Sequence, residues 1–176
     1  MGKIHKIAKV KLIAGLIAAD VNNFELAKKA LCRKFGPIDC ASPVYNFDLT
    51  NYYEREMGQN LKRQFLSFRD LISPEKIAKI KIYTNRIEKM LSKNDTRIVN
   101  IDPGYITGAK LILATTKDYS HRVYLGKGIF AEVTLYFKNN TFCPFEWTYP
   151  DYKTKNYIDT FNGVRKIYME QIKSKY

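Results

Sequence analysis

Side chains that could bind an anion or move a proton gather between residues 114 and 135, around a segment that joins two apolar runs. They are Thr115, Thr116, Lys117, Asp118, His121, Arg122, Tyr124 and Glu132. A four-residue turn at KDYS would set Thr115 opposite Arg122, and a three-residue turn at GKG would set Arg122 opposite Glu132. The spacing therefore predicts one polar row, Thr115–Arg122–Glu132, across three neighbouring strands.

Two interpretations of this row stay open. In the first, Glu132 orients the guanidinium of Arg122 in an anion site, and Lys117 and His121 add positive charge for phosphate or carboxylate. Further hydroxyls and backbone amides would complete the predicted ligand-binding set, those of Thr115, Thr116, Tyr124, Gly126 and Gly128. In the second, Arg122 and Glu132 form an ordinary cross-strand ion pair worth about 0.5 kcal/mol. The pattern alone slightly favours the ion pair.

Three residues are the catalytic candidates. His121 has an ordinary pKa near neutrality, so it is either a general acid or base or a turn residue bound to Asp118. Asp102 stands in NIDPGY, at the expected end of a strand. There it is either a reactive carboxylate or a side chain that bonds the backbone of a Pro-Gly turn. We therefore take His121, Asp118 and Asp102 as candidates for a reaction.

Acidic residues in NYYEREMG offer a metal-binding alternative. Glu54 and Glu56 share one side of an extended chain, and together with Asp102 they could hold a divalent cation that binds phosphate. Acids beside Arg55 are more often ordinary surface charge. The aromatic block WTYPDY, residues 147–152, either stacks on nucleobases or fixes a loop to the core.

The elements that must position these residues follow from the hydrophobic pattern. A buried strand is expected at 10–19 and an amphipathic helix at 22–35, which Gly36 and Pro37 end. Extended segments at 38–48 and 61–72 precede a helix that Ser73 and Pro74 open and that runs to 91. A strand at 97–102 should end in the turn chemistry of Asp102, Pro103 and Gly104. This order, β-α-β-β-α-β, predicts an α+β fold with a ferredoxin-like core and a mainly antiparallel sheet.

Two further elements complete the expected fold. The runs AKLILATT, HRVYL and GIFAEVTLYF predict a β-meander over about 109–147 that extends the sheet. Helical spacing of five apolar residues then predicts an amphipathic helix at the C-terminal end, on Tyr157, Phe161, Val164, Tyr168 and Ile172. The 176 residues are expected to form a single domain, 1–176.

Composition restricts the class of protein and its partners. Lys and Arg number 30 against 17 Asp and Glu, which attracts phosphate-bearing partners such as nucleic acid. The Lys residues are scattered, however, and this favours the coding bias of an AT-rich genome. Three widely spaced cysteines without a CxxC pair predict a reducing, cytoplasmic setting. The basic start followed by LIAGLIAA resembles a signal peptide, but Asp20 and the helix after it favour a buried first strand. No run approaches the ~20 apolar residues of a membrane span, so no membrane partner is expected.

Several long blocks resemble those of one prokaryotic protein family that is catalogued as a domain of unknown function. They are YYEREMG, NIDPGYIT, LATTKDYSHRVYLGKGIFAEVTLYF and WTYPDY, and the resemblance covers nearly the whole chain in the same order. It implies a compact cytoplasmic protein and carries over no catalytic residue. Some relatives carry GTP-binding labels, but this chain has no GxxxxGK[ST] loop, so no P-loop mechanism is implied.

Three hypotheses about function result. The first is binding or processing of a phosphorylated ligand, a nucleotide or an RNA end, by hydrolysis or phosphoryl transfer if the protein is an enzyme. The second is a basic RNA-binding or ribosome-associated module without catalysis, although the RNP1 aromatic pattern is missing. The third is a structural or partner-binding protein in which the polar blocks serve only turns and ion pairs.

Overall fold

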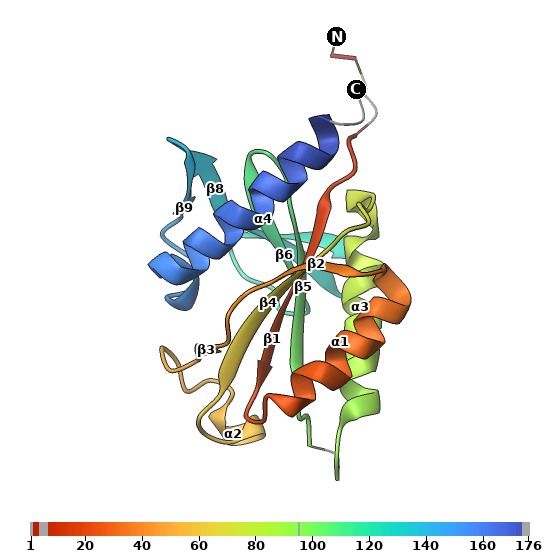
Figure 1. Cartoon of the computed structure of the whole chain (residues 1–176), viewed down its shortest axis with the longest axis vertical. Coiled ribbons are helices and arrows are strands. Elements are labelled where there is room, and N and C mark those ends of the chain that lie inside the picture. Colours follow the sequence, from red (N-terminus) through yellow and green to blue (C-terminus); the bar gives the residue numbers. More distant parts are fainter. Residues whose placement is uncertain (1, 4–6, 95, 174–176) are drawn as a thin grey trace.

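The computed structural model describes residues 2–3, 7–94 and 96–173 (Figure 1). Nine strands form one sheet. They are β1 (Lys11–Ala18), β2 (Ile38–Ala41), β3 (Tyr45–Asn46), β4 (Lys62–Phe68), β5 (Asn100–Ile106), β6 (Lys110–Thr115), β7 (Arg122–Gly126), β8 (Ile129–Lys138) and β9 (Thr141–Pro144). The helices are α1 (Asn22–Phe35), α2 (Glu54–Met57), α3 (Ile77–Leu91) and α4 (Lys155–Lys173), with 3₁₀ turns at Pro74–Lys76 and Asp151–Lys153.

The strand order is β2-β4-β1-β5-β6-β8-β7, with β3 added beside β4 and β9 beside β8. Every strand pair in the register is antiparallel. The α+β class and the mainly antiparallel sheet expected from the sequence are therefore confirmed. None of the helices in the described part of the chain combines the length and hydrophobicity that a bilayer crossing requires.

Helices cover both faces of the sheet, as Figure 1 shows. All eight residues of β1 are buried, because this central strand packs on both sides. Its Leu12 and Leu16 join the core under α1 and α3, whereas Ile13 joins the core under α4. A third, smaller cluster holds Phe47, Met57 and Leu61 against Ile17, at the end of the sheet that α4 leaves uncovered. The fully buried strand expected from the apolar run is thus confirmed.

The helix boundaries agree closely with the sequence signals. Gly36 ends α1 at a φ of 85°, which glycine adopts without strain. Ser73 and Pro74 do mark the approach to α3, but they open a 3₁₀ turn, and the α-helix itself begins at Ile77. The Ser73 hydroxyl bonds Glu75 instead of capping a backbone amide.

The expected turn at Asp102-Pro103-Gly104 was wrong, because β5 runs straight through it to Ile106. Pairing with β6 begins only at Gly104, so the strand at Pro103 has a free edge on that side. A free edge is the kind of position at which a strand accepts proline. Gly104 is needed for the close approach that follows, since a Cβ there would lie 2.3 Å from the carbonyl oxygen of Ile112.

The expected order of the meander was also wrong, because β8 lies between β6 and β7. Arg122 does pair with Glu132 as predicted, across a hairpin whose turn has positive φ at Gly126, Lys127 and Gly128. Thr115, however, pairs with Phe130 and not with Arg122. β8 has ten residues and can pair along the whole of β6, whereas β7 has only five. The longer strand takes the inner place, and residues 116–121 carry the chain past it.

Candidate functional site

The strands β5 and β6 diverge and leave a fork in the sheet. They pair from Gly104 and Leu113 to Ile106 and Leu111, and beyond Leu113 β6 continues only along β8. We call the space between residues 100–103 and residues 114–117 the fork. Two segments with predicted site residues, 100–103 and 114–117, therefore leave the paired part of β5 and β6 at the same end.

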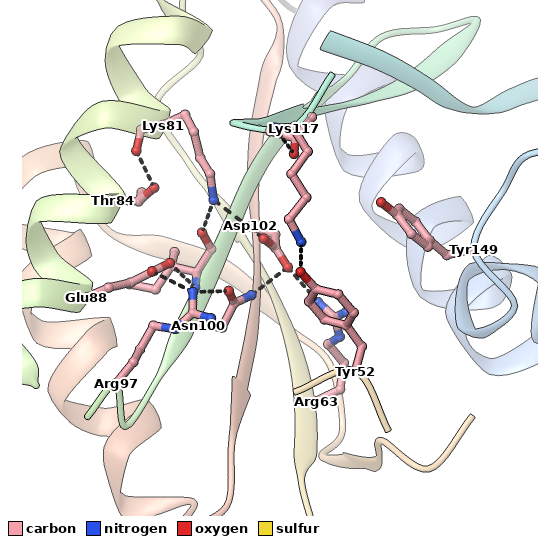
Figure 2. A network of polar contacts seen from close by, with 12 residues as sticks. Tyr52, Arg63, Lys81, Thr84, Glu88, Arg97, Asn100, Asp102, Lys117 and Tyr149 are labelled. Atoms are coloured by element: carbon pink, nitrogen blue, oxygen red, sulfur yellow. Dashed lines mark hydrogen bonds and ion pairs between the residues drawn. The ribbon is translucent and has the colours of Figure 1, made fainter. Parts of the chain in front are cut away.

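Asp102 is the central carboxylate of the fork (Figure 2). Asn100 Nδ2 donates to its Oδ2 at 2.7 Å, while Lys81 Nζ and Arg63 Nη1 each lie 3.5 Å from one of its oxygens. Burial raises the pKa of Asp102, but the charges of Lys81 and Arg63 and the bond from Asn100 outweigh this effect. The net pKa lies below its ordinary value. Asp102 is therefore ionised at neutral pH, and its side chain is still 23% exposed.

Arg63 reaches Asp102 from β4 by crossing the central strand over Gly15. Gly15 pairs with Asp102 on one side and with Phe65 on the other. A Cβ on Gly15 would lie 2.7 Å from Arg63 Nη1. The glycine in the middle of an apolar strand is therefore what lets the guanidinium lie across β1.

A second carboxylate shares the same guanidinium. Arg63 Nη2 donates to Asp151 Oδ2 at 3.2 Å, and the guanidinium carbon lies 5.0 Å from the ring centroid of Phe47 and 5.6 Å from that of Tyr152. Burial raises the pKa of Asp151, and the charge of Arg63 offsets this only in part. Asp102 and Asp151 thus share the charge of Arg63, but the pKa of Asp102 is lowered while that of Asp151 is raised.

The free edge of β5 is capped by α3. Glu88 Oε1 accepts from the amide of Ile101 at 2.7 Å, and Lys81 Nζ donates to the carbonyl of the same residue at 3.0 Å. Arg97 Nη1 bonds both Glu88 Oε2 and Asn100 Oδ1, at 3.0 and 2.8 Å, and its Nη2 bonds Glu56 at 2.6 Å. These side chains replace the strand partner that β5 lacks at the fork.

The predicted pair Arg122 and Glu132 forms the opposite wall. Arg122 Nε donates to Glu132 Oε2 at 3.0 Å, Nη1 donates to the carbonyl of Lys117 at 3.1 Å, and Nη2 donates to the Tyr149 hydroxyl. His121 Nε2 lies 3.1 Å from Glu132 Oε2. Each of the three guanidinium nitrogens of Arg122 has a protein partner, so this residue fixes the surrounding loops, and two of its five N–H groups are left for an anion.

The aromatic block at residues 147–152 closes the site beside Arg122. Trp147 stacks between His121 and Phe145, with ring centroids 5.4 and 4.6 Å away. Burial raises the pKa of the Tyr149 hydroxyl, and the positive charge of Arg122 reduces this rise without cancelling it. The block therefore both fixes a loop and lines the fork, as Figure 2 shows for Tyr149.

Lys117 differs from the other cations of the site. Its ammonium contacts the Tyr52 hydroxyl and lies 3.9 Å from the centroid of that ring. Within the described ranges, no carboxylate pairs with it. Figure 2 shows the side chain extending from beyond β6 toward Tyr52 and Asp102.

Other predicted residues are only partly brought together. Thr115 Oγ1 accepts from the amide of Lys117, and Thr116 and Asp118 are exposed. The Asp118 carboxylate has no polar partner within the part of the chain that the structure describes. Tyr124 is 60% exposed on β7, where its ring contacts Phe130, away from the fork.

The structure does not assemble the expected metal ligands. Glu54 and Glu56 lie in the short helix α2 and not in an extended chain, so an i, i+2 pair no longer shares a side. Glu56 binds Arg97, and Asp102 binds cations. Among the described residues, no group of three or more His, Cys, Asp and Glu side chains is placed to hold a metal ion.

Tyr149 and Asp151 lie in the aromatic block that the sequence offered for base stacking. Sequence reasoning missed several other residues of the site: Tyr52, Arg63, Lys81, Glu88, Arg97 and Asn100. A signal was present for two of them. Lys81 and Glu88 are seven residues apart and therefore lie two turns apart on the buried stripe of α3, where charged residues need a partner.

A family model described as "Domain of unknown function (DUF4416)" matches residues 8–168 of the chain. In the comparisons with curated proteins and with solved structures, nothing matches this chain.

Proposed function

The chain belongs to the DUF4416 family, and we propose that it binds a phosphorylated ligand, a nucleotide or an RNA end, at the fork between β5 and β6. One observation carries this proposal. Arg63, Lys81, Arg97 and Arg122 each have a carboxylate within 3.5 Å, whereas Lys117 has none among the described residues. A phosphate placed on Lys117 would supply the missing negative charge.

The rings around the fork favour a ligand with a base over inorganic phosphate. Tyr52 is 60% exposed and Tyr149 44% exposed, and both lie next to cations of the site. Exposed tyrosine rings stack on nucleobases without much preference for sequence. Lys117 lies over the ring of Tyr52, so this pair of residues would present a surface for base stacking and a phosphate partner together.

Asp102 defines what chemistry the fork would support. Because its pKa is lowered, it accepts hydrogen bonds at neutral pH but is a weak proton acceptor. In a binding protein it would bond a ribose hydroxyl. In an enzyme it would orient water for hydrolysis or phosphoryl transfer, and the predicted proton carriers His121 and Asp118 stand on the opposite wall and on the loop beside it.

Two finer expectations belong to the same proposal. We infer that β1, β2, β4 and β5 with α1 and α3 form a ferredoxin-like core, which the antiparallel order β2-β4-β1-β5 supports. We also infer a cytoplasmic location, which is supported by three cysteines that remain free thiols.

A thermal-shift screen tests the proposal. The panel contains nucleoside mono-, di- and triphosphates, short 5′-phosphorylated RNA and inorganic phosphate. The expected result is a rise in melting temperature with at least one nucleotide or RNA end, which Lys117→Ala abolishes and Lys127→Ala, at the tip of the β7–β8 hairpin, keeps. No rise with any member of the panel would refute the phosphorylated ligand.

The RNA-binding module is the second candidate, because exposed aromatic residues Tyr119 and Tyr124 accompany the excess of basic residues. Such a module would bind mixed RNA with a steep salt dependence, and it would keep that binding in Lys117→Ala.

A further inference from the structure

A hollow of about 330 Å³ is lined in part by Asp151, the second carboxylate of Arg63. The segment from β3 to Leu49, the 3₁₀ turn at Asp151–Lys153 and the start of α4 line it. The residues that matter here are Tyr45, Phe47, Asp48, Asp151, Asn156 and Tyr157. The ligand proposed for the fork would not occupy this hollow.

The lining of the hollow is acidic in a basic protein. Two of its side chains, Asp48 and Asp151, are carboxylates, and none of the described residues that line it is Lys or Arg. Asp48 is exposed and has no ion pair in the described part of the chain. Lys62 comes near the rim, where its ammonium bonds Asn46 Oδ1 at 2.8 Å.

The carboxylate of Asp151 is incompletely compensated. It shares Arg63 with Asp102, and its side chain is nearly buried. Burial raises the pKa of Asp151 even though Arg63 opposes this shift. Asp48 has no ion pair in the described part of the chain, and Asp151 has only a cation that it shares with Asp102, so neither carboxylate at the hollow has a cation of its own.

Aromatic walls accompany the carboxylates. The rings of Tyr45 and Tyr157 pack with centroids 5.2 Å apart, and Phe47 is buried beside them. The side chain of Asn156 is exposed and free of hydrogen bonds within the described ranges, so its carbonyl oxygen is a further acceptor. Carboxylates beside aromatic faces are the usual chemistry for recognising an organic ammonium ion.

We propose that this hollow binds a small primary alkylamine. Its ammonium would lie between Asp48 and Asp151 with Asn156 as a third acceptor, and its alkyl stem would lie against the three rings. The hollow is connected to the fork through Asp151 and Arg63, but amine binding there does not depend on a phosphorylated ligand.

A titration of the full chain followed by ¹⁵N–¹H correlation spectra tests the proposal. The probe is n-butylammonium, and the controls at equal ionic strength are n-butanol, with the same stem and no charge, and butyrate. Butyrate matters because the first turn of α4 would favour an anion. The expected result is saturable shifts confined to residues 45–49 and 151–157 with n-butylammonium alone. Equal shifts with butanol or butyrate would overturn the proposal.

A pair of exposed variants separates the site from a general charge effect. Asp48→Asn should weaken the butylammonium affinity by about fivefold or more. Glu25→Gln, an exposed carboxylate on α1 with the same change of charge, should leave it unaltered. If Asp48→Asn binds as tightly as the unaltered chain, the ammonium site is refuted.

Discussion

Lys81 and Glu88, two turns apart on α3, bind the carbonyl and the amide of one residue, Ile101, at 3.0 and 2.7 Å. The pair gives β5 the two hydrogen bonds that a neighbouring strand would otherwise supply. The fork can therefore stay open to side chains and ligand without leaving the β5 backbone unsatisfied. This relationship explains why charged residues occupy the buried stripe of α3.

Removal of Glu88 should destabilise the protein strongly. Glu88→Ala leaves the amide of Ile101 unsatisfied and removes a carboxylate from Arg97. We expect a loss of about 3 kcal/mol in the free energy of unfolding, measured by urea denaturation. Glu170→Ala, on the exposed side of α4, should change it by less than about 0.5 kcal/mol. Equal losses in the two variants would show that the hydrogen bond from the Ile101 amide to Glu88 does not stabilise the fold.

Ionised Asp102 should contribute stability in a defined pH range. Its pKa in the folded chain is lowered, so its contribution is complete above the ordinary carboxyl pKa near ~3.9 and is lost as the pH falls through the folded value. Asp102→Asn should cost about 2–4 kcal/mol at pH 7, and the difference from the unaltered chain should shrink below about pH 4.

Measurement of both proteins across pH 3–7 checks this prediction. The pKa values of Glu88 and Asp151 are raised, so their contributions fall as the pH rises, in the opposite direction to that of Asp102. Asp151 shares Arg63 with Asp102, so its contribution changes in Asp102→Asn and does not cancel in the difference. A difference that stays constant down to pH 3 would contradict a lowered pKa of Asp102.

Gly15 should be intolerant of even a methyl group. A Cβ there would lie 2.7 Å from Arg63 Nη1 and 3.1 Å from a ring carbon of Phe65, and Arg63 is held by two carboxylates. We expect Gly15→Ala to cost about 1–3 kcal/mol of unfolding free energy. Gly163→Ala, in α4 with nothing within 4 Å of the added atom, should instead stabilise by up to about 1 kcal/mol. Thermal denaturation of both variants distinguishes steric conflict from helix propensity.

The fold was predictable where nearby residues in the sequence determine whether a side chain is buried or which residue it pairs with. The apolar run of β1, the stripe of α1 and the cross-strand partners Arg122 and Glu132 each follow from periodicity or turn length. The strand through Asp102-Pro103-Gly104 was not predictable, because a turn and a free strand edge accept the same residues. Which strand lies beside β6 depends on pairing between distant segments; turn lengths do not decide it, although the run GIFAEVTLYF is twice as long as HRVYL and so favours β8.

The candidate site shows the same division. Asp102, Lys117 and Glu132 were identified because they stand in polar blocks of the sequence. Arg63 and Lys81 were missed because a charged residue inside an apolar strand or helix has no local signal for its partner. Their partner, Asp102, is 39 residues from Arg63 in the chain.

The central claim is that the fork binds a phosphorylated ligand through Lys117. Isothermal titration of the best nucleotide or 5′-phosphorylated RNA from the screen tests it most directly, with the unaltered chain, Lys117→Ala and Lys127→Ala at the same ionic strength. The claim predicts a loss of affinity of about tenfold or more in Lys117→Ala and no change in Lys127→Ala, because only Lys117 stands at the fork. Equal affinities of the three proteins would contradict it.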